Sequence, residues 1–320
     1  MSDFEVVTTQ LTLEADGVVS VRLERVDGQP LPAWQPGAHV DLVLPVGITR
    51  QYSLIDSPAD FSSYRIAVLQ QRSSRGGSEY VHVFLRPGQR VRVGAPRNHF
   101  ALDPADAYRF IGGGIGITPL LSMARAAHAA GTADWTLHYG GRSLRSMAYR
   151  RELRAAYGDH VELWPQDLRG PLPLGELLER PRDADDRRTL VYCCGPEPLI
   201  EAVRATAERN GWPEEDVRFE RFAPTVHEHA PDRAFEVEAR RSGKTVQVEQ
   251  DESLLDGLLR AGIGVSSSCR SGVCGACETR VIEGAVEHRD DILSAAQREA
   301  GESMMVCVSR ARGDRLVLDV

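Results

Sequence analysis

Four cysteines near the end of the sequence have a spacing suited to iron chemistry. Cys269, Cys274 and Cys277 form a C-x4-C-x2-C pattern, and Cys307 follows thirty residues later. This is the ligand pattern of plant-type [2Fe–2S] clusters, in which thiolates bind two irons. Three of the thiolates must come from one tight loop, and two glycines within it let the backbone wrap closely. We therefore expect these cysteines to bind a [2Fe–2S] cluster, with backbone N–H groups directed at the sulfurs.

A structural zinc site and a pair of disulfides are the alternatives for the same cysteines. Zinc sites usually combine paired short spacings or histidines, and no short spacing accompanies Cys307. The spacing therefore favours the cluster. Because [2Fe–2S] proteins generally transfer single electrons, the rest of the sequence has to supply a source of electrons.

The bulk composition is that of an ordinary multidomain protein. A length of 320 residues predicts two or three domains, with 42% apolar and 26% charged residues. No apolar run is long enough to cross a bilayer, and the N-terminus lacks a basic stretch followed by an apolar one. The expected location is the cytoplasm, where six cysteines indicate metal or redox chemistry. A net charge of −8 argues against nucleic acid and membrane partners.

Short strands with period-two alternation occupy the first hundred residues. They cover residues 18–24, 39–44, 64–69 and 89–93, with glycine-containing turns between them. Several such strands in succession predict an antiparallel barrel or sandwich.

Two polar segments in this region have residue types suited to ligand binding. Arg50, Tyr52 and Ser53 follow a strand, and residues 75–78, with the sequence Arg-Gly-Gly-Ser, open a helical stretch over 79–85. The glycines allow close approach of the backbone, and the helix start offers unpaired N–H groups, so we expect an anion site there. The alternative for each segment is an ordinary turn.

Strand–helix alternation begins after residue 104. A buried strand at 108–111 leads into the glycine-rich turn 112–116 and a helix over 120–130, with Thr118 as its cap and Pro119 in its first turn. Strands at 135–139, 160–164 and 189–194 then alternate with helices at 146–156, 174–179 and 197–209. This pattern predicts a parallel α/β sheet that binds ligands at the carboxyl ends of its strands. A pyrophosphate suits the glycine-rich turn, although its spacing is not G-x-G-x-x-G.

Two adjacent cysteines end the last strand of this region. Cys193 and Cys194 must point to opposite faces of the strand, so they do not easily bind one centre together. Cys193 is expected in the core. Cys194, at the strand end, either belongs to the core or lines a nicotinamide site.

The last third begins with a linker and ends with a small domain. Residues 224–234 contain two prolines and no periodicity, which indicates a linker. A hairpin over 235–249, a helix over 254–261 capped by Ser253, and the cluster loop fit a β-grasp fold. Residues 226–320 carry 12 Arg and Lys but 17 Asp and Glu, and Arg270 lies inside the cluster loop. We expect this acidic region to steer an electron-transfer partner, with Arg270 as a local contact.

Together these motifs resemble the phthalate dioxygenase reductase family. The resemblance rests on residues 50–53, 75–78, 112–119, 194–196 and 220–222 and on the four cysteines, which occur in the family's order and cover nearly the whole chain. It implies a multidomain fold in three parts joined by the linker. These are an antiparallel flavin β-barrel over 1–103, an α/β parallel-sheet NAD(P)H-binding domain over 104–223, and an α+β β-grasp ferredoxin domain over 235–320.

The resemblance also implies roles for individual residues. FMN, the family's usual cofactor, would be bound by a set in the barrel: Arg50, Tyr52, Ser53, Val68, Leu69, Gln70, Arg75, Gly76, Gly77 and Ser78. NADH would be bound by Gly113, Gly114, Gly116, Gly195 and Pro196. Three catalytic positions would lie where flavin and nicotinamide meet: Thr118, Cys194 and Phe222. NADPH stays open, because Arg142 follows a strand and can meet a 2′-phosphate.

The implied function is that of the reductase component of an oxygenase system. NADH gives up two electrons as a hydride whereas the cluster accepts one, and a flavin converts between them. The implied partner is a terminal oxygenase met in a transient complex, a Rieske-type ring hydroxylase or O-demethylase, with a cytochrome P450 as the alternative. The chain is expected to be a monomer. Two other classes stay open: a self-sufficient enzyme acting on a bound small substrate, and a redox sensor that uses the cluster as a switch.

Overall fold

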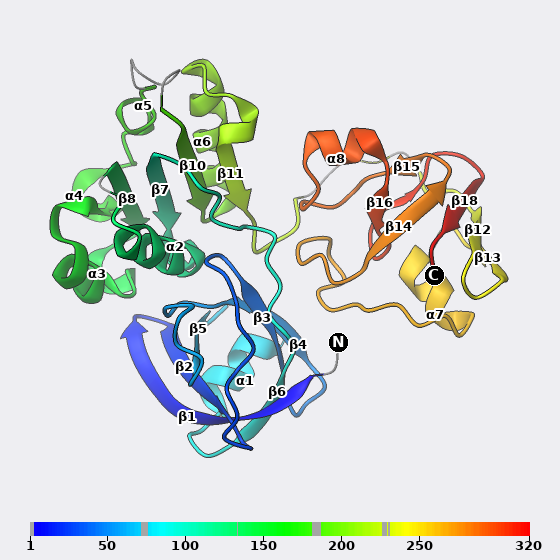
Figure 1. Cartoon of the computed structure of the whole chain (residues 1–320), viewed down its shortest axis with the longest axis horizontal. Helices are drawn as coiled ribbons and strands as arrows, with labels where there is room; N and C mark the ends of the chain where they lie inside the picture. Colours follow the sequence, from blue (N-terminus) through cyan, green and yellow to red (C-terminus); the bar gives the residue numbers. More distant parts are fainter. Residues whose placement is uncertain (1–2, 72–75, 133, 181–186, 226–228, 230) are drawn as a thin grey trace. The chain divides into compact units, whose positions relative to one another are not determined.

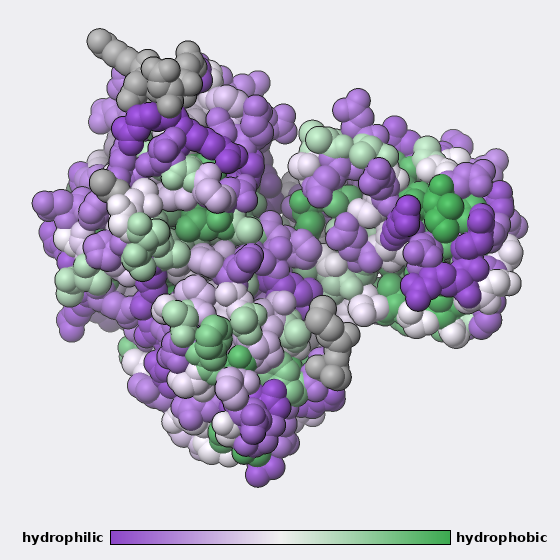
Figure 2. Space-filling view, viewed as in Figure 1, coloured by the Kyte–Doolittle hydropathy of each residue, from purple (hydrophilic) through white to green (hydrophobic). Residues whose placement is uncertain are grey.

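The computed structural model describes the chain except for residues 1–2, 72–75, 133, 181–186, 226–228 and 230. The chain divides into two compact units, unit 1 over Met1–Arg221 and unit 2 over Phe222–Val320. Unit 1 contains an antiparallel and a parallel sheet, and unit 2 contains a mixed sheet (Figure 1). Hydrophilic residues dominate the visible face of each unit, and apolar residues are scattered among them (Figure 2). Within the described residues, none of the helices is both long and apolar enough to span a bilayer.

The first part of unit 1 is a six-stranded antiparallel sheet in the order β4-β3-β6-β1-β2-β5. The sheet curls until its edge strands β4 and β5 come into contact, as a barrel requires. Side chains alternate between the two faces of each strand, and those that face inward form the core of the barrel, among them Leu23, Leu42 and Ile66. Its elements are β1 (Phe4–Ala15), β2 (Val18–Arg25), β3 (His39–Val43), β4 (Thr49–Ser53), β5 (Tyr64–Leu69), α1 (Gly77–Val83) and β6 (Arg90–Val93).

The second part of unit 1 is a five-stranded parallel sheet in the order β11-β10-β7-β8-β9. One face packs on α2 and α3 and the other on α6 (Figure 1). Its strands are β7 (Ala107–Gly113), β8 (Asp134–Gly141), β9 (Val161–Pro165), β10 (Thr189–Cys194) and β11 (Val217–Glu220). Its helices are η1 (Gly114–Gly116), α2 (Ile117–Ala129), η2 (Leu144–Ser146), α3 (Arg150–Tyr157), η3 (Gly158–His160), α4 (Gln166–Arg169), α5 (Leu174–Leu177), α6 (Glu197–Arg209) and η4 (Glu214–Asp216).

The two parts of unit 1 share packing and ion pairs. Barrel residues Ile55 and Phe100 belong to the same buried core as the residues of α2. Arg65 of β5 pairs with Glu152 of α3 at 3.3 Å and with Asp56 of the barrel at 2.8 Å. The Arg65–Glu152 pair joins the barrel to the parallel-sheet part, and the Arg65–Asp56 pair, whose side chains are 16% and 14% exposed, fixes the Arg65 side chain within the barrel.

Unit 2 has the strand order β13-β12-β18-β14-β16, in which only the β12–β18 pair is parallel. Helix α7 packs beside β13, and the Ser253 hydroxyl accepts a bond from the Asp256 N–H at 3.1 Å, which confirms the predicted cap. The arrangement is a β-grasp fold. Its elements are β12 (Phe235–Ala239), β13 (Lys244–Val248), α7 (Leu254–Arg260), β14 (Glu278–Glu283), β15 (Val286–Glu287), α8 (Ala295–Ala300), β16 (Ser303–Met305), β17 (Arg310–Ala311) and β18 (Arg315–Leu318).

Two local predictions differ from the structure. Thr118 does not cap α2, because the helix begins at Ile117 and the Thr118 hydroxyl donates to the Ile115 carbonyl at 3.0 Å instead of accepting a bond. The helix predicted over 146–156 starts only at Arg150. Tyr149 stands before it with φ of 60°, a left-handed conformation that interrupts a helix.

Candidate functional site

The four cysteines of the C-x4-C-x2-C pattern and Cys307 come together in unit 2. All are free thiols; Cys269 is partly exposed and the other three are buried. Thiol–thiol hydrogen bonds join Cys269 to Cys274 and to Cys307, and Cys277 to Cys307. The bond with Cys274 lowers the pKa of the Cys269 thiol, and the bond with Cys307 lowers the pKa of the Cys277 thiol. The same bonds raise the pKa of the Cys274 and Cys307 thiols, so the thiolate character falls on Cys269 and Cys277.

Backbone N–H groups of the loop donate to these sulfurs, as the sequence predicted. The Ser271 N–H donates to Cys269 Sγ at 3.3 Å, and the N–H groups of Ala276 and Gly272 donate to Cys274 and Cys307. Such bonds stabilise thiolates and tune the potential of a cluster. Gly272 has φ of 74°, and a Cβ there would lie 2.9 Å from the Val308 side chain, so only glycine fits the turn.

The donor set fits a two-iron cluster better than a single ion. Among the described residues, no group of three or more His, Cys, Asp or Glu side chains could hold one metal ion. A [2Fe–2S] cluster does not need such a group, because it is a two-iron centre held by four cysteines. The thiol contacts join all four cysteines, since Cys269 bonds with Cys274 and with Cys307, and Cys277 bonds with Cys307.

The two polar segments of the barrel lie against each other. Arg50 stands within β4, and a Cβ on Gly77 would approach its Cγ to 2.6 Å, so the Arg50 side chain crosses directly over the glycine turn. Gly76 has φ of 85°, and the Ser78 hydroxyl accepts a bond from the Gln71 N–H at 3.2 Å. The structure therefore brings together an arginine, a glycine turn and a hydroxyl. Arg75 lies outside the described residues, so its predicted role stays a prediction.

Ser53 supplies the clearest sign of a missing ligand in the barrel. Its hydroxyl is buried and has no hydrogen-bond partner among the described residues. A buried polar group without a partner costs about 1–3 kcal/mol, so a bound molecule that satisfies it is favoured. On the same strand, burial raises the pKa of Tyr52 to about 12.

Strand β5 and the residue after it carry the three residues predicted to line the flavin ring. The Val68 side chain is fully buried in the barrel core. Leu69 is partly buried and Gln70 is exposed, and strand β5 contacts the glycine-rich turn η1. The barrel strand and the turn of the parallel sheet are thus neighbours within unit 1.

The two turns at the carboxyl edge of the parallel sheet pack backbone against backbone. A Cβ on Gly116 would lie 2.3 Å from the Cys194 carbonyl oxygen, and a Cβ on Gly113 would lie 2.9 Å from Pro196. A Cβ on Gly195 would lie 3.1 Å from the Gly113 Cα. Gly114, with φ of 54°, faces open space. These glycines hold the turns β7–α2 and β10–α6 together at the edge where α/β sheets bind ligands.

The predicted catalytic positions differ in exposure. Cys194 is buried in the apolar core under α2, and burial raises the pKa of its thiol well above the ordinary value. It is therefore an uncharged thiol. Cys193 is buried on the opposite face of the strand, as predicted. Thr118 is buried beside η1, whereas Phe222, the first residue of unit 2, is 46% exposed.

Glu220 is a site residue that the sequence reasoning did not single out. It ends β11 in register with Cys194, and its carboxylate charge acts on the Cys194 thiol. The residue as a whole is half-buried, but its Oε2 atom is buried without a partner among the described residues. This burial raises the pKa of Glu220 to about 8. A charged residue at the end of a parallel strand was the available signal.

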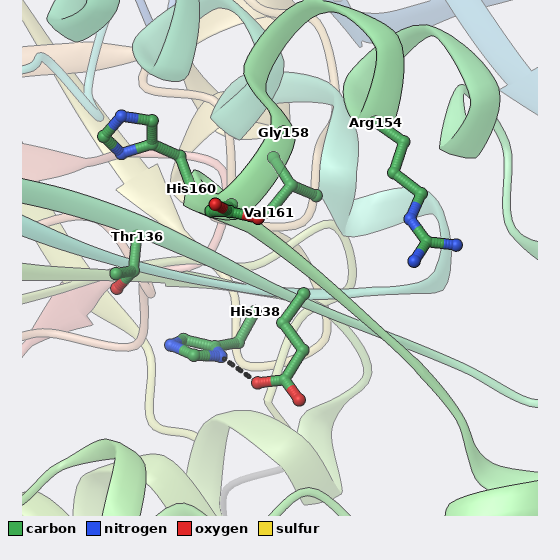
Figure 3. A pocket seen from close by; sticks show the side chains of 8 residues that line it. Thr136, His138, Arg154, Gly158, His160 and Val161 are labelled. Atoms are coloured by element: carbon green, nitrogen blue, oxygen red, sulfur yellow. Dashed lines mark hydrogen bonds and ion pairs between the residues drawn. The ribbon is translucent and has the colours of Figure 1, made fainter.

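A separate polar cavity lies elsewhere on the parallel sheet. It measures about 380 Å³ and its lining includes His138, His160 and Arg154 (Figure 3). His138 bonds with Glu162 at 3.2 Å on the neighbouring strand. The cavity opens where β9 begins, away from the glycine turns at the carboxyl ends, so it is not part of the candidate site.

Comparison with known proteins agrees with this geometry. Residues 237–312 match the 2Fe-2S iron-sulfur cluster binding domain, and residues 110–205 match the oxidoreductase NAD-binding domain. The whole chain is 40% identical to a putative toluene-4-sulfonate monooxygenase system reductase subunit of Comamonas testosteroni, 99% of which is covered. The structure of phthalate dioxygenase reductase matches all of this chain and 98% of its own, with 33% identity and a TM-score of 0.72.

The chain belongs to the phthalate dioxygenase reductase family. Its four cysteines all lie within the iron–sulfur match, and both glycine turns lie within the NAD-binding match. An intact type IV self-sufficient cytochrome P450 monooxygenase also matches, with 40% identity and a TM-score of 0.91. That match covers 99% of this chain but only 41% of the P450 chain, so this chain spans about two fifths of that protein's length.

Proposed function

We propose that this chain is the reductase component of an oxygenase system, which takes a hydride from NADH and delivers single electrons to a terminal oxygenase. The observation that carries the proposal is that one chain combines four converging thiols in unit 2 with two neighbouring features of unit 1. These are the glycine turns at the carboxyl edge of the parallel sheet and the barrel, in which the buried Ser53 hydroxyl has no partner among the described residues. FMN and a [2Fe–2S] cluster, when bound, supply the conversion of one hydride into two single electrons.

In the barrel, this chain's residues would bind FMN. Arg50 lies over Gly77 and offers a guanidinium to a phosphate, and the unpartnered Ser53 hydroxyl offers a donor to the ring. Gly76, with its positive φ, lets the turn bend close to the phosphate. The pocket would be completed by Leu69, Gln70 and Ser78. The turn over residues 75–78 offers a site for one phosphate, which favours FMN over FAD.

At the parallel sheet, the paired turns would bind NADH. The N–H groups of Gly114 and its neighbours at the start of α2 suit a pyrophosphate, and Gly195 and Pro196 would carry the nicotinamide end. NADH is favoured over NADPH because Arg145, one of two nearby cations, is already bonded to Asp16 at 3.0 Å. Arg142 is exposed and is the remaining candidate for a 2′-phosphate.

Three residues would line the place where the flavin and the nicotinamide meet: Thr118, Phe222 and the neutral Cys194. Thr118 is held by its bond to Ile115, so it forms a fixed part of the wall. Burial raises the pKa of the Cys194 thiol well above its ordinary value, so Cys194 would be an uncharged part of this wall.

The organisation around this function is proposed as follows. The flavin barrel covers 1–103, the nucleotide domain 104–223, the linker 224–234 and the ferredoxin domain 235–320. A monomer in the cytoplasm, acting without nucleic acid or membrane, is consistent with the net charge of −8. A Rieske-type oxygenase is the proposed partner.

Electron donation to a cytochrome P450 is a second candidate. The specific observation in its favour is the TM-score of 0.91 to a segment of a self-sufficient P450. The test mixes the NADH-reduced protein with a Rieske-type oxygenase and separately with a P450, and follows cluster reoxidation in each. Rapid reoxidation by the Rieske-type protein alone supports the first proposal, and rapid reoxidation by the P450 alone supports the second. Reoxidation by neither protein contradicts both.

A further inference from the structure

The segment that leads into unit 2 is bonded to that unit almost at once. Two hydrogen bonds join Thr225 to the Asp291 carboxylate, and we call this pair of bonds the clasp. The Thr225 N–H donates to Asp291 Oδ2 and the Thr225 hydroxyl donates to Asp291 Oδ1, each at 2.7 Å. Unit 1 ends at Arg221, and residues 222–224 make no hydrogen bond in the part of the chain that the structure describes. The predicted linker is therefore tied down within four residues of unit 1.

The clasp leads directly to the cluster loop. The Asp291 N–H donates to the Gly272 carbonyl at 2.9 Å, and the Gly272 N–H donates to the Cys307 sulfur. One short series of hydrogen bonds thus joins the incoming chain, through Asp291 and the Gly272 peptide, to a cluster ligand. Asp290 supports the same turn from inside: it is fully buried, and its Oδ1 accepts bonds from two following N–H groups at 3.1 and 2.8 Å.

A second anchor holds the far end of the linker. Asp232 accepts a bond from Arg289 at 2.7 Å, two residues before Asp291. The neighbouring Arg233 carbonyl accepts a bond from the buried Arg310 at 2.9 Å. Glu287 also pairs with His229 of the linker at 3.6 Å, so the segment 287–291 holds the linker at three points and the cluster loop at a fourth.

We propose that Asp291 is a positioning residue for electron transfer between the flavin and the cluster. It fixes the cluster loop to the point at which the chain enters unit 2, and it confines the free part of the connection to residues 222–224. This inference rests on the proposed function. Each transfer it concerns removes one electron from the reduced flavin and adds one to the oxidised cluster, with no bond made or broken.

The expected size of the effect follows from the length of free chain. Without the clasp, the next anchor that the structure describes is His229, which pairs with Glu287 at 3.6 Å, so the connection before an anchor lengthens from three residues to at most seven. The effective concentration of one tethered group at another falls roughly as the −3/2 power of linker length, which gives up to about a 3.5-fold loss. The clasp therefore acts on the flavin-to-cluster step and not on hydride transfer.

The test uses the full holoprotein and opens the clasp from each side. Asp291→Ala removes the acceptor, and Thr225→Pro removes both donors while leaving the Asp291–Gly272 bond in place. Asp251→Ala, an exposed acid of the same unit, is the control. Stopped-flow mixing with NADH follows flavin bleaching first and cluster reduction second, and EPR of the dithionite-reduced protein reports the cluster itself.

The expected result is slower cluster reduction, by up to about 3.5-fold, in both clasp variants, with flavin bleaching and the EPR spectrum as in wild type and in Asp251→Ala. Unchanged cluster reduction in Thr225→Pro overturns the proposal, because Asp291 would then only shape the loop. An altered EPR spectrum in Thr225→Pro also overturns it. Failure of the wild-type flavin to bleach with NADH contradicts the proposed function instead, so the two failures are distinct.

Discussion

Replacing Glu220 by glutamine tests whether a buried carboxyl group lies at the carboxyl edge of the parallel sheet. The pKa of Glu220 is raised from 4.5 to about 8, and the cause is removal of the carboxyl from water. Below pH 4.5 the group is protonated in both the folded and the unfolded protein, so it costs nothing. As the pH rises towards 8, the unfolded chain gains stability by ionising while the folded chain does not, so folding stability falls.

The size of this penalty follows from the two pKa values. At 1.36 kcal/mol per pH unit, the penalty grows by about 4 kcal/mol between pH 5 and pH 8.5. Glutamine has the same shape and does not ionise, so Glu220→Gln should lose that pH dependence and become the more stable protein at pH 8.5. Near pH 5 the two proteins should differ little.

Urea unfolding of the full chain, followed by release of the flavin fluorescence of unit 1, measures the effect. Glu215→Gln is the matched control, because Glu215 is exposed and stands on the turn before the same strand. Its pH dependence should follow that of wild type. If Glu220→Gln also keeps the wild-type slope between pH 5 and pH 8.5, Glu220 is hydrated and the reasoning about its burial is wrong.

Three further predictions concern binding. Gly116→Ala would place a Cβ 2.3 Å from the Cys194 carbonyl and should weaken NADH binding by about 1–3 kcal/mol, or ~5- to 150-fold, while Gly175→Ala, in open space, leaves it unchanged; equal binding in both refutes the packing argument. The kcat/KM for NADH should exceed that for NADPH, and a ratio near one contradicts the assignment. Cluster oxidation by the cognate oxygenase should slow with rising salt and in Arg270→Glu, whose parent side chain is exposed and pairs with Asp256 at 2.8 Å. Rates indifferent to both would leave the acidic unit 2 without a docking role.

The sequence predicted the fold where hydrophobic patterns are long. Strand β2 and the buried strands β7 and β10 lie where their alternation or apolar runs predicted, and the three-part fold class is confirmed. Prediction from the sequence failed where the backbone conformation of one residue decides where a helix begins. The positive φ of Tyr149 makes α3 begin later than predicted, and a tyrosine side chain gives no sequence signal for that conformation. The strands after the cluster loop, such as β14 and β16, were not predicted, because β14 is largely polar and β16 has only three residues.

The candidate site was predicted best where covalent chemistry fixes the spacing. Cluster ligands must follow the geometry of two irons, so the four cysteines were recognisable from their order alone. Contacts made across the fold were not. The Arg50 side chain over Gly77 and the clasp between Thr225 and Asp291 join residues 27 and 66 positions apart, and no local pattern encodes such pairs.

The most direct test of the central claim is an anaerobic NADH titration of the purified holoprotein with EPR detection of the cluster. The account predicts one FMN and one [2Fe–2S] cluster per chain, with a reduced-cluster signal that appears after flavin bleaching. In Cys274→Ser the signal should vanish while NADH still bleaches the flavin, because the thiols and the nucleotide edge lie in different units. A wild-type protein whose flavin bleaches without any cluster signal would contradict electron transfer from NADH through flavin to the cluster.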